Sequence, residues 1–211
     1  MLRMLLARKH ERWLSLSGKL DVRSWQILIS AAVFLTSLSF AADTRSLADS
    51  AQKKFDHIHQ NGQRSRPDSH PTEITEDEVN AHLGSGSVRL PAGVESVRLV
   101  GISGAITGRC RVDFDRVREG RANSNSLLKL FSGVHEVVVS AVAVGSNHKG
   151  RVQVNSVAID GIEVPRFVLE LFVDKYVTPR YPGVGLDSTF ALPDKIETAT
   201  VGQHVLTIVQ R

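Results

Sequence analysis

Two aspartates at alternating positions are the strongest sign of acid–base chemistry in this sequence. Asp113 and Asp115 close an alternating apolar–polar run, so in a strand rising ~3.3 Å per residue they would lie ~7 Å apart on one face. Two carboxylates at that separation could hydrolyse a glycosidic bond. However, Arg109, Arg111 and Arg116 surround them, as on a solvated sheet face. The pattern therefore favours an ordinary solvated face over a catalytic site.

Other catalytic and metal-binding patterns fail on spacing. His57 and His59 are two residues apart in an expected helix, whereas side chains on one helix face are three or four apart. Ser103 lies in a strand–turn context without the strand-to-helix elbow of a nucleophilic serine. Cys110 is the single cysteine, which excludes an intrachain disulfide, and we expect it on the apolar side of a strand. We therefore expect no catalytic residue, no metal site and no cofactor.

Apolar side chains point to binding instead. Residues 151–159 alternate at period two, which predicts a strand. One face would carry Val152, Val154, Ser156 and Ala158, and the other Gln153, Asn155, Val157 and Ile159. After an Asp160-Gly161 turn, a helix is expected over Val164–Tyr176, apolar around most of its circumference. We predict a ligand site lined by Phe167, Val168, Leu171 and Phe172 from the helix, with Val152 and Val154 opposite. A closed core built from the same side chains is the alternative.

The N-terminus predicts a membrane segment. Trp25–Ala42 has no charged residue, and at ~1.5 Å per residue it just reaches across a bilayer core of ~30 Å. Three interpretations stay open: a secretory signal peptide cleaved after Ala41, an uncleaved transmembrane anchor, and a buried core helix of a soluble protein.

Charge sets the expected orientation. Residues 1–41 carry six of the 26 basic and two of the 22 acidic residues, which leaves 20 of each in the remainder. The net charge of +4 therefore belongs to the leader, and the positive-inside rule keeps that leader cytoplasmic. The rest of the chain is expected on the outer side of the cytoplasmic membrane, periplasmic or extracellular. Because it is neutral overall and has no basic stripe interleaved with aromatics, we expect no nucleic-acid partner.

Four regions follow along the chain: a basic leader at 1–24, the signal peptide or membrane anchor at 25–42, a helix and polar linker at 43–72, and an α+β domain at 73–211. Leu47, Ala51, Phe55 and Ile58 form the apolar stripe of the first helix, which would act as a stalk if the anchor is retained. Thr75 and Glu78 have the spacing of a capping box and predict a second helix.

The domain is expected to be rich in strands. Alternation and turn residues predict them at Val94–Ile102, Ala105–Asp115, Val134–Val144, residues 152–159, Ser188–Leu192, Ile196–Val201 and Val205–Val209. Val134–Val144 is apolar on both faces and should be central. Successive hairpins predict a strongly twisted antiparallel sheet of about six to eight strands, packed on the apolar C-terminal helix and preceded by the N-terminal apolar helix.

This order of elements resembles that of small exported lipid-binding proteins of bacteria, the LmeA-type and YpmS-type families. The resemblance spans Glu73–Arg211 and rests on the helix ITEDEVNAHL, the strands ITGRCRVDFD and HEVVVSAVAV, the segment SVAIDGIEVPRFVLELF and the terminal strands after LPDKIETA. It implies that an acyl chain or phospholipid binds between sheet and helix.

We therefore predict a non-enzymatic exported envelope protein that binds membrane lipid, an acyl chain or another apolar ligand, and contacts the membrane through its N-terminal segment. A structural or interaction protein of the cell envelope, with a closed core and no ligand, is the alternative. A hydrolase that uses Asp113 or Asp115 comes third.

Overall fold

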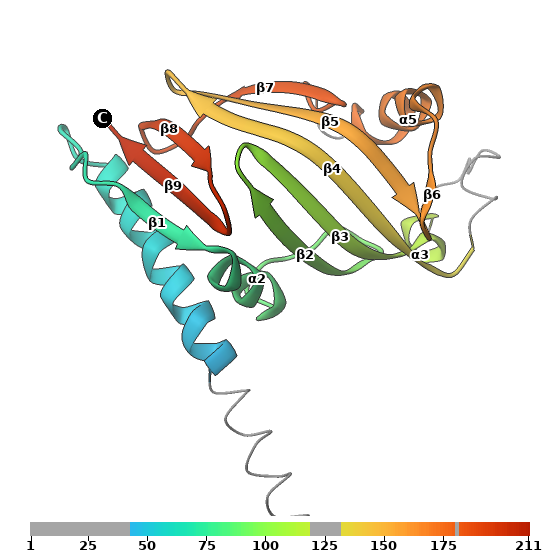
Figure 1. Cartoon of the computed structure of the whole chain (residues 1–211), viewed down its shortest axis with the longest axis horizontal. Coiled ribbons are helices and arrows are strands. Elements are labelled where there is room, and N and C mark those ends of the chain that lie inside the picture. The colour runs from blue at the N-terminus through green and yellow to red at the C-terminus, as the bar shows by residue number, and fades with distance from the viewer. Residues whose placement is uncertain (1–42, 119–131, 180–181) are drawn as a thin grey trace, which may run out of the picture. The chain divides into compact units, whose positions relative to one another are not determined.

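The computed structural model describes residues 43–118, 132–179 and 182–211. The basic leader and the predicted signal peptide or anchor at 25–42 lie outside the described residues and stay predictions. Residues Thr44–Arg211 form one compact unit, whose described residues are drawn in colour in Figure 1. Within the described ranges, no helix combines the length and the hydropathy needed to cross a bilayer.

One antiparallel sheet dominates the unit, accompanied by a few helices, which makes the fold α+β. Its nine described strands are β1 (Thr72–Thr75), β2 (Val94–Ile102), β3 (Ala105–Asp113), β4 (Val134–Ser146), β5 (Lys149–Ile159), β6 (Ile162–Glu163), β7 (Asp187–Ala191), β8 (Ile196–Val201) and β9 (Val205–Gln210). The strand order is β1-β9-β8-β4-β3-β2, and β5 joins β4 to β6 and β7. The sequence did not lead us to expect β1 or β6.

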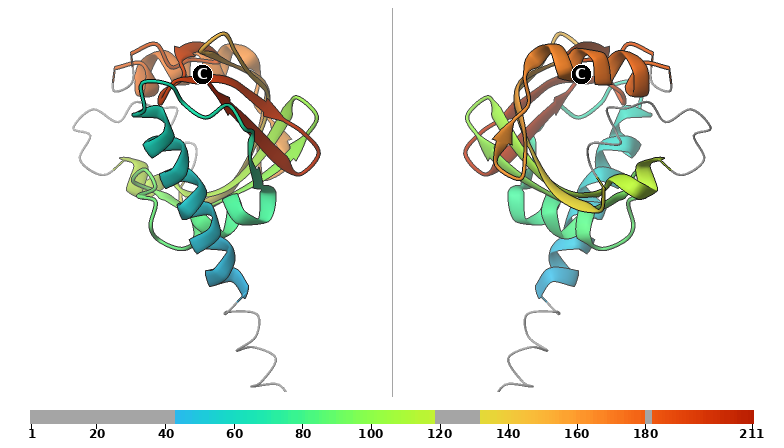
Figure 2. Two further views of the ribbon diagram at one scale, coloured as in Figure 1. Left: turned by 90° about the vertical axis from the view of Figure 1, so that its left-hand side faces the viewer. Right: turned by 90° about the vertical axis from the view of Figure 1, so that its right-hand side faces the viewer.

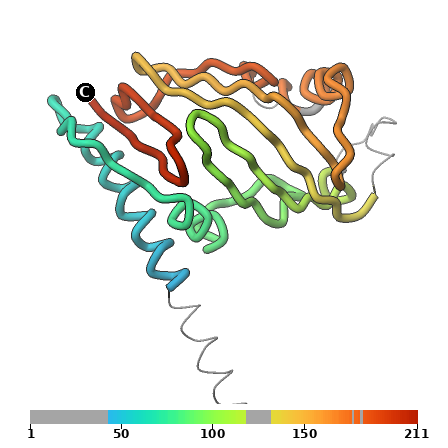
Figure 3. The backbone as a smooth tube through the Cα atoms, in the orientation of Figure 1, coloured from blue at the N-terminus to red at the C-terminus, as the bar shows by residue number. Residues whose placement is uncertain are grey.

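β4 is the central strand, as its apolar sequence predicts. It pairs with β3 from Val134 to Val142, with β5 along almost its whole length, and with β8 at Val144 and Gly145. The β8–β9 pair therefore continues the sheet beyond the end of β3. The backbone trace in Figure 3 shows the β2–β3 hairpin beside the β8–β9 hairpin, where Gly104 N–H donates to the Val201 carbonyl at 2.7 Å.

A bulge in β5 changes which of its side chains share a face. Ser140 pairs with Ser156 but Ala141 pairs with Val154, so Asn155 is an extra residue in β5. Because the alternation shifts there by one position, Val157 joins Val154 on the same face. The expectation that Val152 and Val154 face away from Val157 and Ile159 is therefore wrong. All four side chains share one face of the sheet, because their partners in β4 are the alternate residues Ala143, Ala141, Val139 and Val137. Figure 2 shows that the sheet is strongly curved.

The hydrophobic core lies at one end of this face. Ile58, Ile74, Ile196 and Ile208 form a buried cluster with Phe55, Val79, Leu192, Ala199 and Leu206 packed against it. Residues 43–62 are helical, and their Ala51 and Ile58 are buried as the predicted apolar stripe requires. The first helix thus packs against the strands of the domain expected at 73–211 and belongs to the same compact unit.

The opposite end of the face carries the C-terminal helix. The expected helix at Val164–Tyr176 divides into α5 (Arg166–Phe172) and a π-helix, η1 (Val173–Val177). α5 has no buried residue. Nearby, α3 (Phe114–Arg118) replaces the last residues of the expected strand Ala105–Asp115, and Phe114 is buried.

α2 (Glu76–Gly84) is joined to the first helix by a buried carboxylate. Thr75 and Glu78 form the predicted capping box, with Glu78 N–H donating to Thr75 Oγ1 at 3.2 Å. Glu78 also accepts hydrogen bonds from Ser50 at 2.6 Å and from Lys54 at 2.7 Å. Burial alone would raise the pKa of Glu78, but these hydrogen bonds outweigh it and lower the pKa to about 2.

We expect Glu78 to make the fold sensitive to acid. Its pKa falls from 4.5 in the unfolded chain to about 2 in the folded chain, so its contribution is complete above pH 4.5 and disappears as the pH approaches 2. The free energy of unfolding should fall by about 3 kcal/mol over that window. Urea denaturation of the wild type and of Glu78→Gln at both ends of the window measures this.

The two proteins should differ most in stability at neutral pH and converge at the acidic end. Glu73→Gln is the matched control, because Glu73 is exposed on β1, and it should keep the wild-type pH dependence. A constant difference between wild type and Glu78→Gln across the window would contradict the assignment.

Candidate functional site

An apolar cavity of about 510 Å³ lies between α5 and the sheet. Val137, Val157 and Ile159 line it from β4 and β5, and Val168 and Phe172 line it from α5. Its volume falls within the ~300–1,000 Å³ of typical small-ligand sites. In a tightly packed domain α5 would lie in direct contact with the valines of β4 and β5. Here a space remains between the helix and these strands.

Local hydrogen bonds hold the start of α5 at the edge of the sheet. After the Asp160-Gly161 turn, β6 pairs with the end of β5, and Val164 N–H donates to the Val157 carbonyl at 2.8 Å. Pro165 then caps the helix, where its missing N–H leaves no donor unpaired. Arg166 bonds to Asp187 of β7 at 3.0 Å and to Glu170 at 3.0 Å. The helix is thus tied to the sheet at its first turn.

The structure separates the six predicted site residues into three groups. Val168 and Phe172 line the cavity. Phe167 and Leu171 lie on the outer side of α5, where they are 65% and 53% exposed. Val152 and Val154 share the cavity's face of the sheet but lie farther along β5, outside the lining.

Sequence reasoning missed Val157, Ile159 and Leu169, which also line the cavity. Strict alternation placed Val157 and Ile159 on the far face because it takes no account of a bulge. The polar pair Asn155-Ser156 inside a valine-rich strand is a sequence signal of that irregularity. For Leu169, the helix periodicity does not indicate which apolar side faces the sheet.

Polar groups gather at the edge of the cavity next to the β5–β6 turn. His135 Nδ1 lies 2.5 Å from Asp160 Oδ2, and its Nε2 lies 3.0 Å from the Ser132 carbonyl oxygen. Asp160 Oδ1 accepts the Glu136 N–H at 2.9 Å. The hydrogen bond to Asp160 raises the pKa of His135, and the same bond lowers the pKa of Asp160. One end of a mostly apolar cavity is thus lined by a hydrogen-bonded imidazole–carboxylate pair.

The aspartates considered for catalysis bind backbone amides instead. Asp113 Oδ1 accepts the N–H groups of Asp115 at 2.9 Å and Arg116 at 3.2 Å, which caps the start of α3. Asp115 Oδ2 accepts the Gly133 N–H at 2.9 Å. Throughout the part of the chain that the structure describes, no group of three or more His, Cys, Asp or Glu side chains could hold a metal ion.

We expect His135 to titrate above its ordinary pKa of 6.5. Because the folded pKa is raised, the ion pair stabilises the fold below pH 6.5 and loses that contribution as the pH rises through the folded value. An NMR titration of the imidazole ring protons measures the pKa, and Asp160→Asn should lower it. An unchanged His135 pKa in that variant would show that Asp160 does not set it.

Comparisons with family models, curated proteins and solved structures gave no match to this chain. The resemblance to LmeA-type and YpmS-type proteins therefore stays a prediction.

Proposed function

We propose that this chain is a non-enzymatic lipid-binding protein of the cell envelope and that the cavity between β4, β5 and α5 holds an acyl chain. The observation that carries this proposal is the 510 Å³ apolar space beneath a helix that has no buried residue. In this proposal the bound chain completes the packing of the sheet on its C-terminal helix.

The wall residues support an apolar ligand on energetic grounds. Val137, Val157, Ile159 and Val168 are half-buried, so each has apolar surface that a ligand can still cover. Burying one methylene contributes ~0.8 kcal/mol. Ten methylenes would contribute ~8 kcal/mol, which corresponds to a Kd of ~1 μM before the costs of ordering the ligand.

The uneven distribution of polar groups supports an amphiphile over a plain hydrocarbon. The His135–Asp160 pair lies at one edge of the cavity, with the exposed carboxylate of Glu163 beside it on β6. A lipid could place its head at this edge and its chain against the valines. Such a ligand, and the charge-free segment at residues 25–42, fit a protein exported to the outer side of the cytoplasmic membrane and held there by its N-terminus.

An interaction protein of the envelope is the second candidate. Ile162, Phe167 and Leu171 are each more than half exposed around α5, and exposed apolar side chains of this size are common where proteins meet partners or membranes. A partner that covers the outer side of α5 would not need the cavity to be filled.

Val168→Glu tests the lipid site, and Leu171→Glu is its matched control. Both residues lie on α5, but Val168 lines the cavity whereas Leu171 is 53% exposed. A carboxylate in an apolar cavity must either keep its water or take up a proton, and both are unfavourable for a bound acyl chain or for the protein. We therefore expect Val168→Glu to weaken binding of a fluorescent fatty-acid probe about ten-fold or more. Leu171→Glu should bind the probe like the wild type.

Organic extraction of the purified wild-type protein followed by mass spectrometry provides an independent measurement, and lipid is expected in the extract. If the extracts contain no lipid and the protein does not bind the fluorescent probe, the lipid-binding proposal is wrong. Loss of probe binding in Leu171→Glu alone would favour the interaction surface over the cavity.

A further inference from the structure

A single row of paired residues runs from the cavity under α5 to a second cavity on the same face of the sheet. The strand registers pair Val157 with Val139, Val139 with Gly108, and Gly108 with Leu99. Paired residues of neighbouring strands point to one face, so these four lie side by side across β5, β4, β3 and β2. Val157 lines the first cavity, and Leu99 lines the second.

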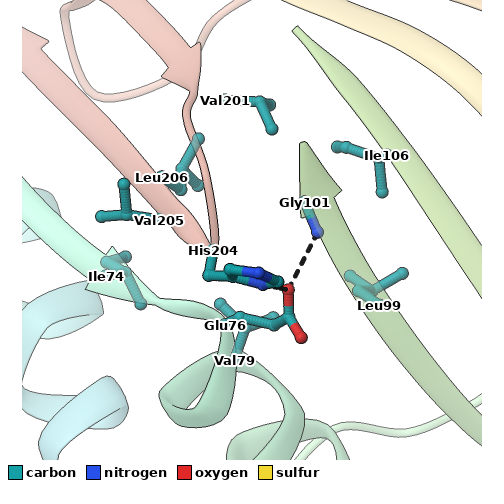
Figure 4. A pocket seen from close by; sticks show the side chains of 10 residues that line it. All are labelled: Ile74, Glu76, Val79, Leu99, Gly101, Ile106, Val201, His204, Val205 and Leu206. Carbon is teal, nitrogen blue, oxygen red and sulfur yellow. Dashed lines mark hydrogen bonds and ion pairs between the residues drawn. The ribbon is translucent and has the colours of Figure 1, made fainter. Parts of the chain in front are cut away.

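The second cavity measures about 90 Å³ and lies where α2, β2, β3 and the β8–β9 hairpin meet. Figure 4 shows its apolar side chains, among them Val79, Leu99 and Ile106, directed toward a common space. Glu76 and His204 supply its polar side.

Two hydrogen bonds fix that polar side. Glu76 Oε2 accepts the Gly101 N–H at 3.0 Å and lies 2.7 Å from His204 Nδ1. Burial would raise the pKa of Glu76, but the hydrogen bonds from His204 and Gly101 lower it, so the carboxylate stays charged. Each cavity thus has a largely apolar lining and one hydrogen-bonded histidine–carboxylate pair within it.

Gly108 lies between the two cavities and contributes no side chain to the floor. Among the described residues, a Cβ added at Gly108 would meet one atom within 4 Å outside its chain neighbours, Leu99 Cδ2, at an ordinary contact distance of 3.5 Å. Val139 beside it is half-buried. Gly108 itself is buried. The middle of the row is therefore low and apolar, and an added methyl group would meet only an ordinary van der Waals contact there.

The length of the row matches a membrane lipid. Three strand spacings of ~4.8 Å separate Val157 from Leu99, which gives ~14 Å. One leaflet of a bilayer has a hydrocarbon thickness of ~15 Å, half of the ~30 Å core. A chain that starts under α5 and ends in the second cavity therefore needs the length of a membrane acyl chain.

We propose that the two cavities and the row between them form one groove, selective for long-chain over short-chain acyl groups, in which the tail crosses Gly108 and ends beside Leu99 and Ile106. This inference rests on the proposed lipid-binding function and adds the class of chain. A short chain fills the cavity under α5 alone, whereas a long chain occupies both cavities.

Gly108→Val tests the groove by placing a branched side chain on its floor. Binding of octanoate and oleate to the full-length protein is measured by displacement of a fluorescent fatty-acid probe, below the micelle concentration of each. The wild type should bind oleate about ten-fold or more tightly than octanoate, since each further buried methylene adds affinity. Gly108→Val should bind octanoate like the wild type and lose most of the preference for oleate.

Thr107→Val is the matched control, because Thr107 is the neighbouring residue of β3 and its side chain lies on the opposite face. It should leave both affinities unchanged. Circular dichroism and the urea midpoint establish that each variant is folded. If Gly108→Val is unfolded, Ile106→Phe, which narrows the second cavity from the same strand, takes its place with the same expectation.

If the folded Gly108→Val variant, or Ile106→Phe in its place, keeps the wild-type preference for oleate, the proposal of one continuous groove is wrong. The cavity under α5 would still be a candidate site for the acyl chain. Equal affinities for octanoate and oleate in the wild type would overturn it as well. If the wild type binds neither fatty acid, the result contradicts the proposed lipid-binding function and not only the continuous groove.

Discussion

The packing of four isoleucines between the first helix and the sheet is the interaction on which the rest of the structure depends. Ile58 of that helix meets Ile74 of β1, Ile196 of β8 and Ile208 of β9, and these strands join β4 through β8. This cluster gives the unit a closed core at one end. Since β4 also runs to the other end, its far half is held in place by strand pairing and needs no helix packed tightly against it.

The inner face of β2 to β5 can therefore stay apolar without being buried. Val139, Val154 and Val157 are half-buried, and α5 spans the end of this face without burying any of its own residues. A face of that kind normally costs stability in water, because apolar surface is left uncovered. In the proposed function, a bound acyl chain covers this surface between the valines of the sheet and α5.

Local signals in the sequence were enough to predict most of the secondary structure. Alternation predicted β2 at Val94–Ile102 with its observed bounds, and Thr75 with Glu78 predicted the capping box of α2. The apolar residues spaced along the first helix, Ile58 among them, predicted a helix. They did not predict which strands it packs against, because β1 and β9 come together only in the folded chain. In the candidate site, Val168 and Phe172 were found from helix periodicity. Val157 was missed because the Asn155 bulge depends on pairing with β4.

The position of a bound chain is the most direct test of the account. With a carbon-13-labelled fatty acid and methyl-labelled protein, intermolecular NOEs identify the methyl groups that touch the chain. We expect NOEs from the chain methylenes to Val157 and Val168, which line the cavity from the sheet and from α5. NOEs confined to Leu171 on the outer side of α5 would contradict it, because the lipid would then bind the surface of the helix and leave the cavity empty.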